Sequence, residues 1–124
     1  MDLKEIMQYQ SFVVVGNTVD KEKYACKIKE GLIEKGYFAY GVWKEYDSIN
    51  AIEEEIDVID LCINPKWGLH YIKECNKKFK CIVIQPGAEN EELIKYLQEH
   101  QLPYIEGCIL VGLKLHAKGK ENEK

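Results

Sequence analysis

The feature that most constrains the fold is a pair of short, uninterrupted apolar runs, FVVV at residues 12–15 and CIVI at residues 81–84. A strand that is apolar on both faces must be covered on both faces, which is typical of a parallel sheet between two layers of helices. Similar runs occur at residues 38–42, 58–63 and 103–105. We therefore predict an α/β fold with an open, parallel, five-stranded sheet in three layers.

The segment between the first two runs has the start, the face and the end of a helix. Asp20 is a candidate N-cap, and Tyr24, Ile28 and Leu32 recur at i, i+4 and i+8 as an inward apolar face. Gly36 supplies the left-handed position at which many helices end. Helices alternate with strands and parallel crossovers are right-handed, which is consistent with an open three-layer sheet. The strand order that we expect is the Rossmann-like order 3-2-1-4-5.

Two more helices carry start signals. Asn64 and Pro65 place a capping side chain and a preset φ angle at the beginning of one. Glu89, Glu91 and Glu92 crowd the first turn of the other, where the helix dipole favours negative charge. The crossover over residues 47–55 can form only a short helix or an irregular segment, and the type of the apolar stretch at residues 108–116 stays open.

The length of 124 residues is that of one domain, which we place at residues 1–116. Asp2 is a candidate cap for a short helix beside the first strand. The polar segment 117–124 is expected to be a disordered tail.

Charge and cysteine usage narrow the possible partners. The net charge is −4, which disfavours nucleic acid and anionic membranes, and all 17 basic residues are lysine. A phosphate must then be held by backbone N–H groups, helix N-termini or lysine. The five cysteines show neither C-x-x-C nor zinc-type spacing, so we expect a cytoplasmic protein without a metal site. Any redox role stays open for the cysteines, which are Cys26, Cys62, Cys75, Cys81 and Cys108.

Four loops follow strands and should meet at the carboxyl edge of the sheet, where such folds bind ligands. The first contains Gly16, Asn17 and Thr18, which can form either an anion site or a plain turn. With one glycine, it matches neither the dinucleotide fingerprint nor the P-loop. In the second, Trp43 and Lys44 can hold a purine and a phosphate, although a surface tryptophan is the simpler interpretation. Trp43 and Lys44 also occupy the end of the second strand, where an NAD site has an acidic residue that binds the ribose hydroxyls.

The other two loops allow the same pair of interpretations. Asn64 and Pro65 are sufficient to start a helix, while Gln85, Pro86 and Gly87 form a strand-to-helix turn. What favours a ligand site is that all four loops converge on one edge. Cys108 follows the fifth run and is either a reactive thiol or a buried one. No catalytic motif is present, so no catalytic residue is expected.

These motifs together resemble the small standalone CoA-binding proteins, single Rossmann-type domains similar to the CoA-binding domain of the succinyl-CoA synthetase alpha subunit. The matching stretches are FVVVGNTVDKEKYACKIKEGLIEKGYFAYGV, IDVIDLCINP and CIVIQPGAENEEL, and the similarity runs from about residue 6 to about residue 116. One departure is Val42-Trp43-Lys44, where the family commonly has Val-Asn-Pro.

The resemblance implies a cytoplasmic monomer or homodimer that binds CoA or an acyl-CoA without catalysis. The first loop would receive the diphosphate at the helix N-terminus, the end of the second strand would hold the nucleotide, and the turn after the fourth strand would flank the pantetheine arm. The implied binding residues are Gly16, Asn17, Thr18, Lys23, Tyr24, Val42, Trp43, Lys44, Asn64, Pro65, Gln85, Pro86 and Gly87. The alternatives are binding of a related adenine nucleotide, a small NAD(P)-binding oxidoreductase-like protein, and a degenerate Rossmann domain that acts through protein contacts.

Overall fold

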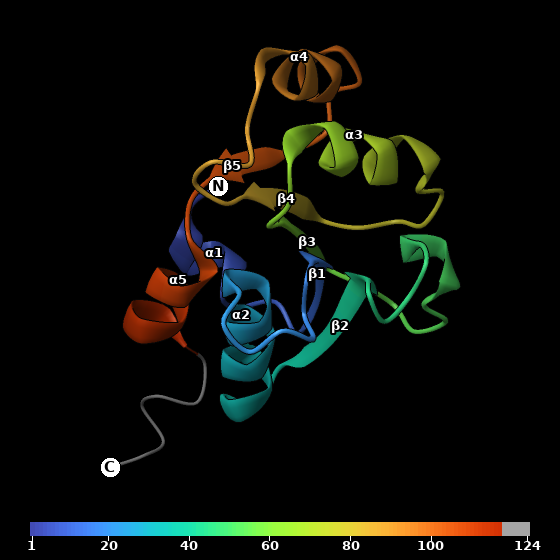
Figure 1. Ribbon diagram of the computed structural model, residues 1–124. Coiled ribbons are helices and arrows are strands. Elements are labelled where there is room, and N and C mark those ends of the chain that lie inside the picture. Colours follow the sequence, from blue (N-terminus) through green and yellow to red (C-terminus); the bar gives the residue numbers. More distant parts are fainter. Residues whose placement is uncertain (118–124) are drawn as a thin grey trace.

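The computed structural model describes residues 1–117 and contains one five-stranded sheet in which all neighbouring strands are parallel (Figure 1). The strands are β1 (Ser11–Gly16), β2 (Phe38–Trp43), β3 (Val58–Leu61), β4 (Cys81–Ile84) and β5 (Tyr104–Glu106). The helices are α1 (Leu3–Ile6), α2 (Tyr24–Glu34), the 3-10 turn η1 (Ile49–Ala51), α3 (Pro65–Glu74), α4 (Glu91–Glu99) and α5 (Ile109–His116). The α/β class is confirmed. Most of the predicted tail, residues 118–124, lies outside the described residues.

The expected strand order 3-2-1-4-5 is wrong, because the order is β2-β1-β3-β4-β5. Val14 of β1 lies between Gly41 of β2 and Asp60 of β3, so the third strand pairs with the free edge of β1 instead of extending beyond β2. The segment between β2 and β3 contains only η1 as a regular element, and it returns the chain across β1. The order of growth therefore reverses between β1 and β3, and this reversal marks the switch point at which open α/β sheets bind ligands.

Helices cover the two faces of the sheet unequally. The ribbon in Figure 1 has α3 and α4 on one face and α1, α2 and α5 on the other. Ile59 and Leu61 of β3 belong to the apolar core under α3 and α4, whereas Val58 and Cys62 pack with the core under α2 and α5. Because side chains alternate along a strand, Asp60 shares the face of Val58 and Cys62.

Most of the expected helix ends are confirmed. Asp2 forms a capping box with Glu5, and the Asn64 side chain accepts a hydrogen bond from the first turn of α3. The first turn of α4 contains Glu91 and Glu92 as expected, and its cap is Asn90, which was not predicted. Gly36 has φ +90° directly after the C-cap of α2. The open stretch at residues 108–116 forms α5, which packs against α1 and α2.

The start of α2 differs from expectation in two ways. The N-cap is Lys23, with no side-chain hydrogen bond to the helix, while the carboxylate of Asp20 accepts from the amide of Glu22 in the preceding turn. Tyr24 is 65% exposed, and Ala25 lies inward in its place. Ala25, Ile28 and Leu32, at i, i+3 and i+7, form the buried face of α2, and Tyr24 lies one position off this face.

No helix within residues 1–117 is long and apolar enough to span a membrane.

Candidate functional site

Gly16 ends β1 at the switch point, and packing alone requires a glycine there. A Cβ atom at this position would lie 2.4 Å from the carbonyl oxygen of Cys62 and 2.9 Å from Cβ of Ala25. Gly16 therefore lets the first turn of α2 lie directly against β1 and the end of β3. In the register, Gly16 pairs with Trp43, so the loops after β1 and β2 start side by side.

The side chains of Asn17 and Thr18 are both used inside the loop after β1. The Asn17 side-chain oxygen accepts from the amides of Val19 at 3.2 Å and Asp20 at 3.0 Å, which fixes the turn. Thr18 is buried, and its hydroxyl donates to Glu45 at 2.6 Å. These two side chains hold the loop in position, so the groups of the loop that remain for a ligand are those of its backbone.

Glu45 ties the second loop to the first. Its carboxylate accepts from Thr18 and forms an ion pair of 2.7 Å with Lys29. Burial alone would raise the pKa of Glu45, but the hydrogen bonds from Lys29 and Thr18, with the lysine charge, lower it overall. Gly41 makes room for this contact, because a Cβ there would lie 2.2 Å from the Thr18 hydroxyl oxygen.

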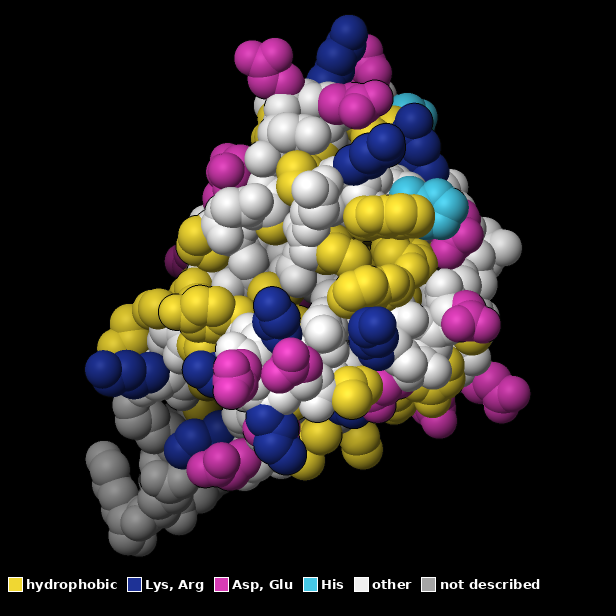
Figure 2. All heavy atoms as spheres, in the orientation of Figure 1, with side chains coloured by type: hydrophobic (Ala, Val, Ile, Leu, Met, Phe, Trp, Pro, Cys, Tyr) yellow, Lys and Arg dark blue, Asp and Glu magenta, His cyan; other side chains and the backbone are white. Residues whose placement is uncertain are grey.

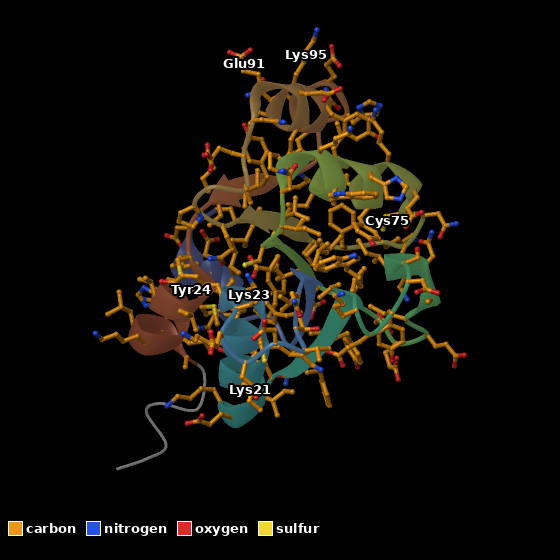
Figure 3. All side chains as sticks on the ribbon, viewed as in Figure 1. Lys21, Lys23, Tyr24, Cys75, Glu91 and Lys95 are labelled. Carbon is orange, nitrogen blue, oxygen red and sulfur yellow. The ribbon has the colours of Figure 1, made fainter. Side chains whose placement is uncertain are left out.

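The amino end of α2 is open to an anion. Lys23 provides no side-chain acceptor for the first-turn amides, and the first turn holds no acidic residue. Unpaired amides and the helix dipole both favour a negative group at such an end. Figure 3 shows Lys23 and Tyr24 near this end of the helix, with Tyr24 toward α5, whereas Lys21 lies farther along α2. Lys21 is paired with Glu30 at 2.8 Å on the surface.

Trp43 ends β2 in a backbone conformation that is rare for a large side chain. Its φ is +109°, and its ring is 44% exposed. The Lys44 ammonium lies 4.5 Å from the centre of this ring, a cation–π contact, whereas Val42 is fully buried. Backbone strain of this kind is concentrated at functional sites. The predicted pair Trp43 and Lys44 thus presents a flat ring and a charge, and Val42 belongs to the core.

Asn64 and Pro65 act as the start of α3. The Asn64 side chain accepts from the amide of Lys66 at 2.9 Å, and Pro65 occupies the first turn. Both flank the edge of the sheet, but the Asn64 oxygen is already used.

The turn after β4 joins the site to α5. Gln85 is 4% exposed, and its side-chain oxygen accepts from the amide of Ile109 at 2.9 Å. Gly87 has φ +88°, as its place in a tight turn predicts, and its amide donates to Glu89 at 3.0 Å. Gln85 therefore fixes where α5 begins, and Pro86 stays at the surface.

A cavity of about 160 Å³ opens between these elements at the switch point. Its lining is mostly apolar and consists of Tyr24, Cys62, Gln85, Pro86 and Cys108. Three of these residues were predicted for the site. Cys62 was not predicted for the site, because an apolar run in the sequence does not indicate which of its cysteines will line a cavity. Larger hollows, lined by residues 53–57 with 77–80 and by residues along α4, contain none of the predicted residues.

On the face of β3 that carries Cys62 lies a buried acid that sequence reasoning missed. Asp60 is fully buried in β3, and neither carboxylate oxygen has a hydrogen-bond partner. Burial raises the pKa of Asp60 well above its usual range, with a smaller effect from nearby Cys108. Burial, Asp60 and Cys108 likewise raise the pKa of the Cys62 thiol to about 12. The sequence signal that could have indicated Asp60 is the presence of an acid within the otherwise apolar run at residues 58–63.

The surface of the molecule mixes charge signs. Figure 2 shows lysines and acidic side chains interspersed, with hydrophobic side chains gathered near the centre of the face. Within residues 1–117, no group of three or more His, Cys, Asp or Glu side chains is placed to hold a metal ion.

Comparison with known proteins gives a match to one protein family. A family model described as a CoA binding domain matches residues 10–114. No curated protein matches the chain significantly.

Solved structures share the fold. A conserved hypothetical protein from Pyrococcus furiosus is 29% identical, covers 83% of this chain and 98% of its own, and superposes with a TM-score of 0.73. A hypothetical protein from Pyrococcus horikoshii is 26% identical, with 93% and 89% covered and a TM-score of 0.81. A Thermus thermophilus protein at 20% identity, with 92% and 98% covered and a TM-score of 0.75, shows the fold alone.

Proposed function

This chain belongs to the CoA binding domain family, and on that premise we propose that it binds CoA or an acyl-CoA at the carboxyl edge of its sheet, without catalysing a reaction. The observation that carries the proposal is the amino end of α2. It has neither a side-chain cap nor an acid in its first turn, and its Tyr24 lines the cavity at the switch point. That combination suits a phosphorylated ligand with an apolar arm.

The diphosphate is assigned to the first-turn amides of α2 and to the exposed Lys23. The sequence contains no arginine, so a bidentate guanidinium contact is not available. Asn17 and Thr18 contribute indirectly, because their side chains hold the loop and leave only its backbone to approach a phosphate.

The adenine is assigned to the ring of Trp43 and a phosphate to Lys44. A half-exposed indole ring offers a stacking surface for a purine, and the ammonium 4.5 Å from its centre adds charge beside it. The pantetheine arm then runs past Pro86, and its end enters the mostly apolar cavity beside Cys62 and Cys108.

The contacts of Glu45 disfavour an NAD-type ligand. An acid after the second strand serves NAD by accepting hydrogen bonds from ribose hydroxyls. In this chain Glu45 is already engaged by Thr18 and Lys29, and the position before it is Lys44.

Thermal unfolding with a ligand panel under reducing conditions tests the proposal. At 100 times its dissociation constant, a ligand adds about 2.7 kcal/mol and raises the midpoint by several degrees. CoA should give this shift, and NADH and NADPH should not. No shift with CoA, or an equal shift with NADH, contradicts the proposal.

A matched pair of lysine variants locates the phosphate. Lys23→Ala should reduce the CoA-induced shift, whereas Lys95→Ala should not, because Lys95 is exposed on α4 and away from the edge (Figure 3). Equal reductions by both variants would indicate a general charge effect and remove Lys23 from the site.

A further inference from the structure

Two thiols from distant parts of the chain line the same small cavity. Cys62 follows β3 and Cys108 follows β5, and both contribute to the cavity of about 160 Å³ beside Tyr24 and Pro86. Both are free and partly exposed. Asp60 lies two residues before Cys62 on the same face of β3, and Cys108 raises the pKa of both groups.

Hydrogen bonds of the neighbouring backbone amides fix the position of Cys108, while its sulfur makes no hydrogen bond to α5. The amide of Gly107 donates to Ile84 at 3.0 Å, and the amide of Ile109 donates to the Gln85 side chain at 2.9 Å. Cys108 is the N-cap of α5, yet its side chain makes no capping hydrogen bond. The neighbours on both sides are fixed, so the thiol is presented to the cavity from a rigid position.

The buried Asp60 completes the arrangement. Its carboxyl group has no partner among the described residues, and burial raises its pKa well above the usual range. Asp60 is therefore a buried polar group without a partner, near the cavity where the sulfur of the ligand would lie.

We propose that Cys108 captures the thiol end of the ligand as a mixed disulfide in this cavity. The proposal rests on the function proposed above, because CoA supplies the thiol. The reaction partner is the disulfide form of the ligand, R–S–S–R. The Cys108 thiolate attacks one sulfur, the S–S bond of the ligand breaks, and a Cys108–S–S–R bond forms. The other half leaves as R–S⁻ and takes the proton given up by Cys108, so one cysteine sulfur is oxidised and one ligand sulfur is reduced.

Cys62 explains why the adduct persists. To release the ligand by exchange, the Cys62 thiol would have to ionise and attack the mixed disulfide. Burial, with Asp60 and Cys108 nearby, raises the pKa of Cys62 to about 12, so it stays protonated at neutral pH. The reaction therefore stops after one ligand per chain, which is capture and not turnover.

The other cysteines offer internal controls. Cys26 and Cys81 are buried, and Cys75 is partly exposed but follows α3, which covers the other face of the sheet (Figure 3). The Cys75 sulfur lies 3.7 Å from the carbonyl oxygen of Lys77 and lines none of the cavities described. A general reaction of exposed thiols would modify Cys75 as readily as Cys108.

The experiment treats the full chain with CoA disulfide in the absence of reductant and follows intact mass. We expect a gain of one CoA per chain that dithiothreitol reverses. Trypsin places every cysteine in a peptide of its own, and Cys108 lies in the peptide of residues 96–114. The adduct should map to that peptide, should be lost in Cys108→Ser and should remain in Cys75→Ser.

A comparison with glutathione disulfide tests recognition. If the cavity receives the end of a bound CoA, CoA disulfide should react at least about tenfold faster than glutathione disulfide. Equal rates, an adduct mainly on Cys75, or an internal Cys62–Cys108 disulfide in place of the adduct would each overturn the proposal.

Reversible binding separates this inference from the function on which it rests. The wild-type chain could show the CoA-induced thermal shift in the presence of reductant and yet form no adduct with CoA disulfide in the absence of reductant. In that case the capture proposal is wrong and the binding proposal stands. If neither the shift nor the adduct appears, the binding proposal fails as well.

Discussion

The hydroxyl of Thr18 donates a 2.6 Å hydrogen bond to the carboxylate of Glu45, and this contact joins the loop after β1 to the loop after β2. The bond is partly buried, and Lys29 pairs with the same carboxylate. The two loops that carry the assigned phosphate and adenine contacts are therefore held together from within the protein.

Replacing Thr18 by valine should remove this hydrogen bond with little change in the shape of the side chain. Because the lost bond is to a charged group, we expect a destabilisation of about 1–2 kcal/mol at pH 7 in urea unfolding. The lowered pKa of Glu45 means that its contribution is present above its unfolded pKa of about 4.3 and is lost as pH falls through the folded value. The difference between variant and wild type should thus narrow at pH 3. A constant difference would show that Glu45 is not involved.

A methyl group at Gly16 should destabilise the fold before it affects any ligand. The added Cβ would meet the carbonyl of Cys62 at 2.4 Å, and overpacking of this kind costs about 1–3 kcal/mol or more. Gly68→Ala is the matched control, because its Cβ would meet Leu61 at 3.4 Å inside a helix, where alanine is favoured by about 1 kcal/mol. Urea midpoints should fall for the first variant and stay or rise for the second.

Asp60→Asn should stabilise the protein at neutral pH. An aspartate with a raised folded pKa gives full stability below its unfolded pKa of about 3.9 and loses stability as pH rises from there toward the folded value. The asparagine variant avoids this loss, so its thermal midpoint should exceed that of the wild type at pH 7 and should vary less with pH.

Asp57→Asn is the comparison for this effect. The Asp57 carboxylate accepts from the amides of Gln10 at 3.1 Å and Ser11 at 3.0 Å, so its replacement should destabilise the protein. A lower midpoint for Asp60→Asn at pH 7 would mean that the buried carboxyl has a compensating partner.

Trp43→Gly should separate stability from binding. Glycine adopts a φ of +109° freely, so the unfolding midpoint should be unchanged or higher, while loss of the ring should weaken CoA binding about tenfold. In Trp67→Phe, the remaining Trp43 fluorescence should respond to CoA, whereas in Trp43→Phe the remaining Trp67 should not. A response from Trp67 alone would move the adenine to another surface.

Lys44→Ala should weaken CoA binding more at low salt than at high salt. Lys44 acts through charge beside an exposed ring, and salt screens such interactions over about 10 Å at 0.1 M. Titrations at two salt concentrations measure the effect. Unchanged affinity at both would remove Lys44 from the site.

Strand positions and helix ends followed from the sequence because each depends on local chemistry. The apolar runs at residues 12–15 and 81–84 are buried strands, and the Asn64 cap and the Gly36 terminus act within one turn. The strand order did not follow, because a right-handed crossover lets β3 join either edge of the β1–β2 pair. Hydrophobic periodicity describes which faces are buried and not which edge a strand joins.

The composition of the site was predictable only in part, for a related reason. Residue type indicated Trp43 and Lys44, but it could not show that the Thr18 hydroxyl is used by Glu45 or that Tyr24 points outward. Asp60 and Cys62 were missed because their importance comes from tertiary contacts across β3, α2 and α5. Partners far apart in the sequence decide whether a polar group is available.

Because α1 packs against α5, the folded domain is longer than the segment that matches the family model. Gly112 of α5 lies so near Met7 and Leu3 that a Cβ there would be 2.9 Å and 3.1 Å from their side chains, and the Tyr37 hydroxyl donates to the carbonyl of Met7 at 2.6 Å. The family match begins only at residue 10. Anyone who trims the protein to that boundary removes the support of the helix that presents Cys108, so the first nine residues belong in every expressed version of the domain.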